Sequence, residues 1–223
     1  MKKNLCEIVV ILDESGSMES CKTDTISGVN LFLNNQKRIS GEANVTLLKF
    51  SDYYKIINDS IPLDQIVYLD ENNYTPANTT ALLDAVGRTI NTIGKRLADT
   101  PEADRPEKVI FTIITDGYEN ASHEFSRKQI FDMVSFQKNK YSWEFIFLGA
   151  NIDAWGEEIG ITLNVNIQKD DLKRSFKGLS HHVLCCRMEK LFDPSDSFDL
   201  TESELDRKLG QLGKDQEIKK SSG

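Results

Sequence analysis

The sequence has 223 residues and a mass of 25.3 kDa, which suits one substantial α/β domain or such a domain with an appendage. Hydrophobic residues make up 39% and charged residues 28%, which is ordinary for a globular chain and argues against extensive disorder. The net charge of -8 argues against nucleic-acid binding, because an acidic chain repels phosphate and no basic stripe offsets it.

The N-terminal segment and the cysteines indicate the compartment. No apolar run approaches the roughly 18 to 20 residues that a membrane-spanning helix needs, so we expect no membrane partner. The first apolar stretch is interrupted by Glu7 and ends at Asp13, which favours a buried strand over a signal peptide and hence a cytoplasmic protein. The four cysteines lack C-x-x-C spacing and, together with three histidines, show no zinc pattern, so we expect reduced structural thiols.

Strand and helix patterns alternate along the chain, which predicts a mostly parallel sheet flanked by helices. We expect strands at residues 6–12, 44–50, 53–57, 109–114, 143–148 and 163–165. We expect helices at residues 25–39, 81–97, 126–139, 154–159 and 170–178. The strand at 109–114 is the most apolar and therefore central, and Ser126 is the expected N-cap of the third helix.

The pattern weakens near residue 181, and we place a boundary there between a domain at 1–180 and an extension at 181–223. The extension is expected to hold an apolar edge element, a short helix at 201–212 that begins with a capping box, and a flexible tail. Two neighbouring pairs, His181-His182 and Cys185-Cys186, lack metal-ligand spacing, so we expect them on an edge strand packed against the core.

Polar side chains follow two strands of the predicted sheet, where ligands bind in folds of this kind. Asp13, Ser15 and Ser17 follow the first strand, with Gly16 allowing a tight turn, and Asp116 follows the central strand. Carboxylates and hydroxyls without nitrogen or sulfur suit a hard cation such as Mg²⁺. Taken alone, the first group could equally be an Asx turn that ends a strand.

The same residues carry a resemblance to a known family. Asp13-Glu14-Ser15-Gly16-Ser17 matches the D-x-S-x-S motif of the von Willebrand factor type A family, where it forms a metal-ion-dependent adhesion site (MIDAS). Residues 78–85 resemble the family's G-G-T-x-L-x-x-A loop, with Asn78 and Thr79 at positions where glycines are common, and Thr115-Asp116-Gly117 matches its third loop. The resemblance covers about residues 5–176. Residues 118–122 resemble the corresponding segment of stand-alone bacterial and phage members of the family.

This resemblance implies a role for each matched residue. Ser15, Ser17 and Thr80 (rather than Thr79) would bind the metal directly, and Asp13 and Asp116 would act mostly through water. The implied metal is Mg²⁺, with Mn²⁺ as a substitute, and an Asp or Glu of a protein partner would fill the open coordination position. The implied fold is a three-layer α/β/α sandwich. Its Rossmann-like, doubly wound sheet would have about six mostly parallel strands and one antiparallel edge strand.

Residues around the motif receive structural interpretations. We expect the site to lie at the surface, Glu14 to be a solvated carboxylate, Asp84 to be a helix-surface acid and Met18 to pack at a helix start. Glu119 and Asn120 either cap the next segment or line the rim of the site. Three tyrosines are candidates for an aromatic rim around the metal: Tyr53, Tyr54 and Tyr118.

These observations favour a metal-dependent adaptor or scaffold and not an enzyme. The alternative enzyme is a Mg²⁺-dependent phosphoryl hydrolase with Asp13 as nucleophile, but Ser15 stands where haloacid-dehalogenase-type enzymes have a second aspartate. No G-x-S-x-G or G-x-x-x-x-G-K motif occurs either. A third hypothesis is a self-assembling subunit that forms a homo-oligomer, in which the acidic residues 193–206 of the same or a neighbouring copy supply the missing carboxylate.

Overall fold

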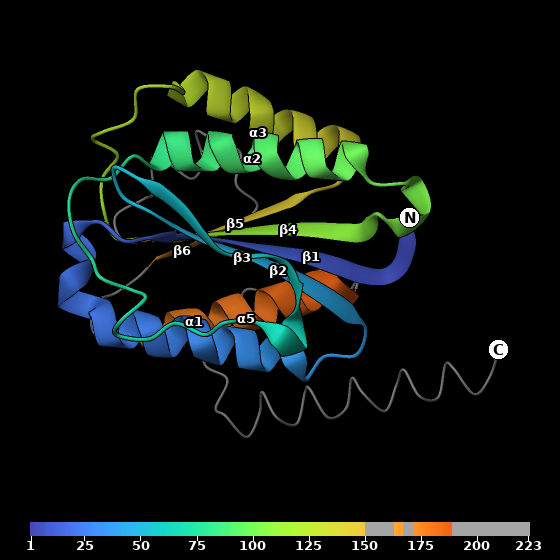
Figure 1. Cartoon of the computed structure of the whole chain (residues 1–223), viewed down its shortest axis with the longest axis horizontal. Coiled ribbons are helices and arrows are strands. Elements are labelled where there is room, and N and C mark those ends of the chain that lie inside the picture. Colours follow the sequence, from blue (N-terminus) through green and yellow to red (C-terminus); the bar gives the residue numbers. More distant parts are fainter. Residues whose placement is uncertain (150–162, 167–171, 189–223) are drawn as a thin grey trace.

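The computed structural model describes residues 1–149, 163–166 and 172–188 (Figure 1). The helices expected at 154–159 and 201–212 and the tail lie outside the described residues. The described strands are β1 (Lys2–Asp13), β2 (Glu42–Phe50), β3 (Tyr54–Pro62), β4 (Pro106–Thr115), β5 (Glu144–Gly149) and β6 (Leu163–Asn166). The described helices are the 3₁₀ segments η1 (Gly16–Cys21), η2 (Leu63–Gln65) and η3 (Glu102–Asp104), and α1 (Lys22–Lys37), α2 (Leu82–Asp99), α3 (Arg127–Tyr141) and α5 (Leu172–Met188).

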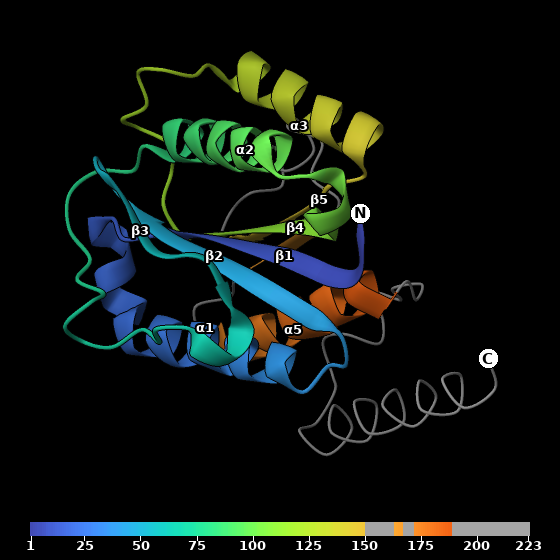
Figure 2. The same ribbon diagram turned by 45° about the vertical axis from the view of Figure 1, so that its right-hand side comes forward.

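The six strands form one sheet in the order β3-β2-β1-β4-β5-β6. Every adjacent pair is parallel except β2–β3, so β3 is an antiparallel edge strand. Helices α1 and α5 cover one face and α2 and α3 the other, which gives three layers (Figures 1 and 2). The predicted fold class is therefore confirmed.

Strand β1 shows why the sheet is buried on both faces. Its side chains alternate between faces, as in any strand, so Ile8 and Val10 join the core beneath α1 and α5. Val9 and Ile11 join the second core, beneath α2 and α3. All four are fully buried, which explains why this strand is a nearly continuous apolar run rather than an alternating one.

The last helix differs from the prediction. Helix α5 runs from Leu172 to Met188, past the expected end at residue 178, and residue 180 lies inside it. The residues His181, His182, Cys185 and Cys186 are therefore helical, and their assignment to an edge strand is wrong. The reason is the helical spacing of the apolar residues Leu172, Phe176, Leu179 and Val183, which all enter the core on the α1 side.

Other boundaries differ by a few residues. Strand β3 continues to Pro62, beyond the expected end at residue 57. Ser126 is the N-cap of α3 as predicted, and it forms a capping box with Gln129. Among the described residues, no helix combines the length and the apolar composition that crossing a membrane requires.

The packing of α1 against α5 depends on a residue without a side chain. A Cβ atom added to Gly28 of α1 would lie 2.1 Å from the Phe176 ring of α5. Gly94 of α2 is the opposite case, because the nearest atoms to an added Cβ are 3.9 and 4.0 Å away. The two glycines lie in helices and differ in the space around them.

We therefore expect opposite effects from the same substitution. Gly94→Ala should raise the free energy of unfolding by about 0.5–1 kcal/mol, because alanine favours the helix and meets no obstacle. Gly28→Ala should lower it by about 1–3 kcal/mol, because overpacking against Phe176 outweighs the same helical gain. Urea unfolding of both variants measures this, and equal stabilisation by both would show that α5 does not pack closely on α1.

Candidate metal centre

The sheet brings the predicted site residues together at the edge formed by the carboxyl ends of its parallel strands, which we call the metal-binding edge. Strands β1 and β4 are parallel neighbours, with Leu12 opposite Ile114, so the loops that follow them begin side by side. Asp13 is the last residue of β1, and Asp116 directly follows the last residue of β4. The third segment, residues 77–81, leads into α2 and is attached by a backbone hydrogen bond from Gly16 N to Asn78 O (3.1 Å). This edge lies at the left in Figure 1.

Hydrogen bonds connect four of the five predicted residues. Asp13 Oδ1 accepts from Ser15 N at 2.7 Å, and its Oδ2 accepts from the Thr115 hydroxyl. The hydroxyls of Ser15 and Ser17 are 3.1 Å apart, and Ser17 Oγ donates to Asp116 Oδ1 at 2.7 Å. The two carboxylates are thus connected through Ser15, by its backbone N–H and its hydroxyl, and through the Ser17 hydroxyl.

Thr80, the fifth residue, faces the same small space. A Cβ atom added to Gly117 would lie 2.8 Å from Thr80 Oγ1, 3.1 Å from Ser17 Oγ and 3.2 Å from Asp13 Oδ2. Three oxygens, two from the end of β1 and its loop and one from the segment before α2, therefore converge around a position that glycine leaves open in the loop after β4.

Asn120 fixes the backbone of Thr80. Thr80 N donates to Asn120 Oδ1 at 2.9 Å, and Asn120 N donates to Thr80 O at 3.1 Å. Thr80 is 3% exposed, whereas Thr79 is exposed to solvent. The geometry therefore brings Thr80, and not Thr79, toward Ser17 and Asp13.

The donor set fits a hard divalent cation. Among the described residues, no group of three or more His, Cys, Asp or Glu side chains could hold a metal, so a site here must rely on hydroxyls beside Asp13 and Asp116. Burial raises the pKa of Asp13 to about 6, opposed by the hydrogen bonds from Thr115 and Ser15. A nearby cation would favour the charged carboxylate, so the converging oxygens and the desolvated acid are suited to Mg²⁺.

The expectation of a surface site is wrong for most of its residues. Asp13, Ser15 and Thr80 are buried, and among the predicted ligands only Ser17 is well exposed. The connection between β3 and α2 covers the end of β1, and Tyr74 OH donates to Asp13 O at 2.7 Å. Substituting Asp13 would therefore disturb the fold as well as the site.

Glu14 is not solvated, contrary to expectation. Its side chain is fully buried and forms an ion pair with Lys49 Nζ at 2.7 Å. The carboxylate also accepts from Tyr53 OH and Thr75 N, while Lys49 Nζ donates to Asn73 O at 2.6 Å. This buried pair ties the β1 loop to the connection that delivers Thr80.

Asp84 is likewise a buried residue rather than a helix-surface acid. Its carboxylate accepts from the backbone N–H groups of His123, Glu124 and Phe125 at 2.8, 2.9 and 3.0 Å. Glu119 lies in the loop after β4, and its carboxylate accepts from Leu83 N at the start of α2 at 2.9 Å. The two acids therefore fasten α2 to the loop after β4. The sequence places Asp84 in the first turn of a predicted helix and Glu119 after the third loop of the motif, but it does not reveal the partners of either acid.

The remaining residues around the site follow the predictions in part. Met18 is 1% exposed and belongs to the core, as expected. Tyr54 is half-buried and its hydroxyl lies 3.2 Å from that of Thr89. Tyr118 is 70% exposed and Tyr53 37%, so an aromatic rim would consist of these two rings.

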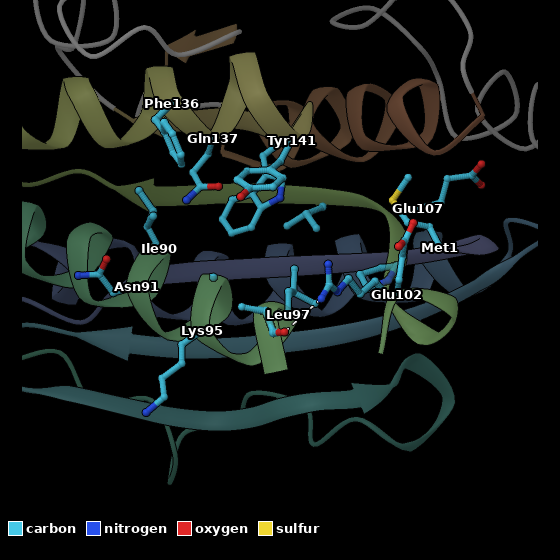
Figure 3. A pocket seen from close by; sticks show the side chains of 16 residues that line it. Met1, Ile90, Asn91, Lys95, Leu97, Glu102, Glu107, Phe136, Gln137 and Tyr141 are labelled. Atoms are coloured by element: carbon cyan, nitrogen blue, oxygen red, sulfur yellow. Dashed lines mark hydrogen bonds between the residues drawn. The ribbon is translucent and has the colours of Figure 1, made fainter. Parts of the chain in front are cut away.

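A cavity of about 480 Å³ lies at the opposite edge of the sheet (Figure 3). It opens between α2 and α3, with Leu97 on one side, Phe136 and Tyr141 on the other, and Met1 at one end. None of the predicted metal ligands lines it. The cavity and the candidate metal centre are therefore separate features.

No family model matches the sequence, and no curated protein matches it either. The fold, however, matches solved structures. The von Willebrand factor domain of the type V pili tip protein Mfa5 from Porphyromonas gingivalis aligns over 80% of this chain and 94% of its own, with a TM-score of 0.53 and 10% identity. The chain has a von Willebrand factor type A-like fold.

Two further likenesses support this von Willebrand A-like assignment. A mutant of the PilB minor pilin from Streptococcus sanguinis aligns over 80% of this chain and 61% of its own (TM-score 0.59, 13% identity). Proximal thread matrix protein 1 from the mussel byssus, solved with a zinc-occupied MIDAS motif, aligns over 80% and 46% (TM-score 0.52, 12% identity). The chain thus spans less than two thirds of both proteins, and at such identities the likeness establishes the fold alone.

The buried ion pair beneath the site yields a stability prediction. Lys49→Met should lower the free energy of unfolding by about 3–5 kcal/mol, because it leaves the Glu14 carboxylate buried without its cation. Adding Glu14→Gln to that variant should recover part of the loss, since the uncompensated charge is gone. Chemical denaturation of the single and double variants measures the coupling.

The exposed pair Lys128–Asp132 on α3 provides a matched control. Lys128→Met should change stability very little, because both partners are solvated. Additive losses for Glu14→Gln and Lys49→Met would show that the two side chains do not interact in the folded protein.

Proposed function

We propose that this chain is a metal-dependent protein-binding module that holds an acidic side chain of a partner through a divalent cation, and that it is not an enzyme. The observation that carries the proposal is the convergence of Thr80, Ser17 and Asp13 oxygens around Gly117. Such a set of few carboxylates and several hydroxyls leaves a cation electron-poor and therefore attractive to an outside carboxylate.

The residues that would hold the metal have distinct roles in this proposal. The hydroxyls of Ser15, Ser17 and Thr80 would bind it directly, and Asp13 and Asp116 would act mostly through water. Mg²⁺ is the proposed ion, with Mn²⁺ as a substitute, because all five residues offer oxygen. The zinc-occupied MIDAS motif of the byssus protein supports the idea that a fold of this kind accommodates a divalent cation.

The state of Asp13 favours binding over hydrolysis. A nucleophilic aspartate needs a free carboxylate oxygen directed at the substrate. Here Oδ1 accepts from Ser15 N and Oδ2 accepts from the Thr115 hydroxyl, and the residue is fully buried. These contacts suit a carboxylate that orients hydroxyls better than one that attacks phosphorus.

Isothermal titration of Mg²⁺ and Mn²⁺ into metal-stripped protein tests the proposal. We expect saturable binding at one site, lost in Asp116→Ala and weakened in Ser17→Ala, since both residues are at least partly exposed and their truncation should leave the core intact. Circular dichroism establishes that the variants are folded. Metal binding that survives Asp116→Ala would exclude this site, and turnover of generic phosphoesters would favour the phosphoryl hydrolase instead.

Gly117→Ala gives a second prediction that removes no ligand. The added methyl group would lie 2.8 Å from Thr80 Oγ1 and occupy the space where the three oxygens converge, so we expect metal binding to fall below detection. Gly94→Ala is the matched control, because its methyl group enters open space far from this edge. Unchanged metal affinity in Gly117→Ala would mean that the cation, if bound, lies elsewhere.

A further inference from the structure

The loops at the metal-binding edge have an unusual charge composition. Four described segments form this edge: residues 13–21, 51–53, 70–81 and 116–126. They contain no Lys or Arg. They contain nine acids: Asp13, Glu14, Glu19, Asp52, Asp70, Glu71, Asp116, Glu119 and Glu124.

Cations from neighbouring elements neutralise three of these acids. Glu14 pairs with Lys49 of β2, and Glu71 pairs with Lys22 of α1 at 2.8 Å. Arg88 of α2 holds Glu124 with two hydrogen bonds, at 2.9 and 2.6 Å. These three cations are therefore already engaged and would not attract the carboxylate of a partner.

Six acids remain without an ion pair to any described residue. Asp13 and Asp116 lie in the candidate metal centre, where their two charges would offset a divalent cation. The other four are Glu19, Asp52, Asp70 and Glu119, and the first three are exposed. We call these four acids the acidic rim, because each lies in a loop of the metal-binding edge and has no ion pair to a described residue.

A partner must satisfy two opposite requirements at such an edge. Its carboxylate is attracted by the cation, but any further acid beside that carboxylate is repelled by the rim. We propose that the partner is a protein segment in which one Asp or Glu is flanked by Lys or Arg, so that the acid reaches the metal and the basic residues meet the acidic rim. This inference rests on the proposed function and specifies its partner.

An exposed aromatic ring supports basic flanks. Tyr118 directly follows Gly117, and its side chain is 70% exposed beside the metal centre. A solvated tyrosine face attracts a Lys or Arg side chain through a cation–π interaction, and arginine is the more frequent partner. Tyr118 would therefore contact a basic residue next to the acid that binds the metal.

The same charges disfavour the acidic segment of this chain as the occupant. Residues 193–206 contain six acids and no Lys or Arg. Presenting one of these carboxylates to the metal would bring the others against Glu19 and Asp52. We therefore expect a different protein, rather than a second copy of this segment, at the site.

A peptide-display selection on the full chain tests the proposal. The library fixes a central Asp or Glu and randomises the three residues on each side, and selection is run in Mg²⁺ and in EDTA. We expect Mg²⁺-dependent enrichment of peptides with Lys or Arg in the flanks. Metal-dependent enrichment of neutral or acidic flanks would overturn this inference while leaving the proposed function intact, and no metal-dependent enrichment would count against the proposed function itself.

Two variants then examine the rim with one selected peptide. Glu19→Gln removes an exposed rim charge and should weaken binding by up to about fivefold, with a smaller salt dependence. Tyr118→Ala should weaken a peptide with basic flanks more than one with neutral flanks. Glu102 of η3, an exposed acid at the opposite edge, provides the matched control, and Glu102→Gln should leave affinity unchanged. Equal affinities for Glu19→Gln and Glu102→Gln would overturn the role of the rim.

Discussion

The burial of the Asp13 carboxylate is the constraint on which the candidate site depends. This side chain lies at the end of a fully buried strand and receives hydrogen bonds from Ser15 N and the Thr115 hydroxyl. A buried carboxylate is costly unless hydrogen bonds or a cation compensate its charge. Here the hydrogen bonds leave the pKa raised to about 6, so the compensation is incomplete and the addition of a cation would stabilise the charged form.

The three buried acids of this edge are compensated in three different ways. Glu14 has an internal cation in Lys49, and Asp84 has three backbone N–H groups from the loop after β4. Both arrangements are complete within the chain, so these acids fasten loops and need nothing from solution. Asp13 differs because, besides Ser15 N, its neighbours are hydroxyls that themselves have lone pairs to offer. Of these three acids, only Asp13 therefore has neighbouring oxygens that could also bind an external cation.

These differences explain which features could be predicted from the sequence. The three layers, the mostly parallel sheet and the convergence of Asp13, Ser17, Thr80 and Asp116 could be predicted from local patterns and a short motif. The burial of Glu14 could not be predicted, because its partner Lys49 lies 35 positions away and Lys49 by itself resembles a solvated strand residue. The same holds for Asp84, whose acceptor role requires three N–H groups about 40 residues later in the chain. The helix expected at residues 170–178 is too short, because Gly178 is a poor helix former and only the packing of α5 against α1 shows that the helix continues past it.

The ion pairs inside the metal-binding edge also determine the charge of its surface. Lys49, Lys22 and Arg88 come from the elements beneath the loops, and each is used to hold a loop acid in place. The described loops of this edge contribute no Lys or Arg, so the ion pairs that hold them leave the outer rim negative. In its described part, the edge therefore lacks positive charge both among the buried oxygens and at the rim. A divalent ion would supply it among the buried oxygens, and basic residues of a partner would supply it at the rim. A partner that brought only carboxylates would be attracted by the metal ion and repelled by the acidic rim.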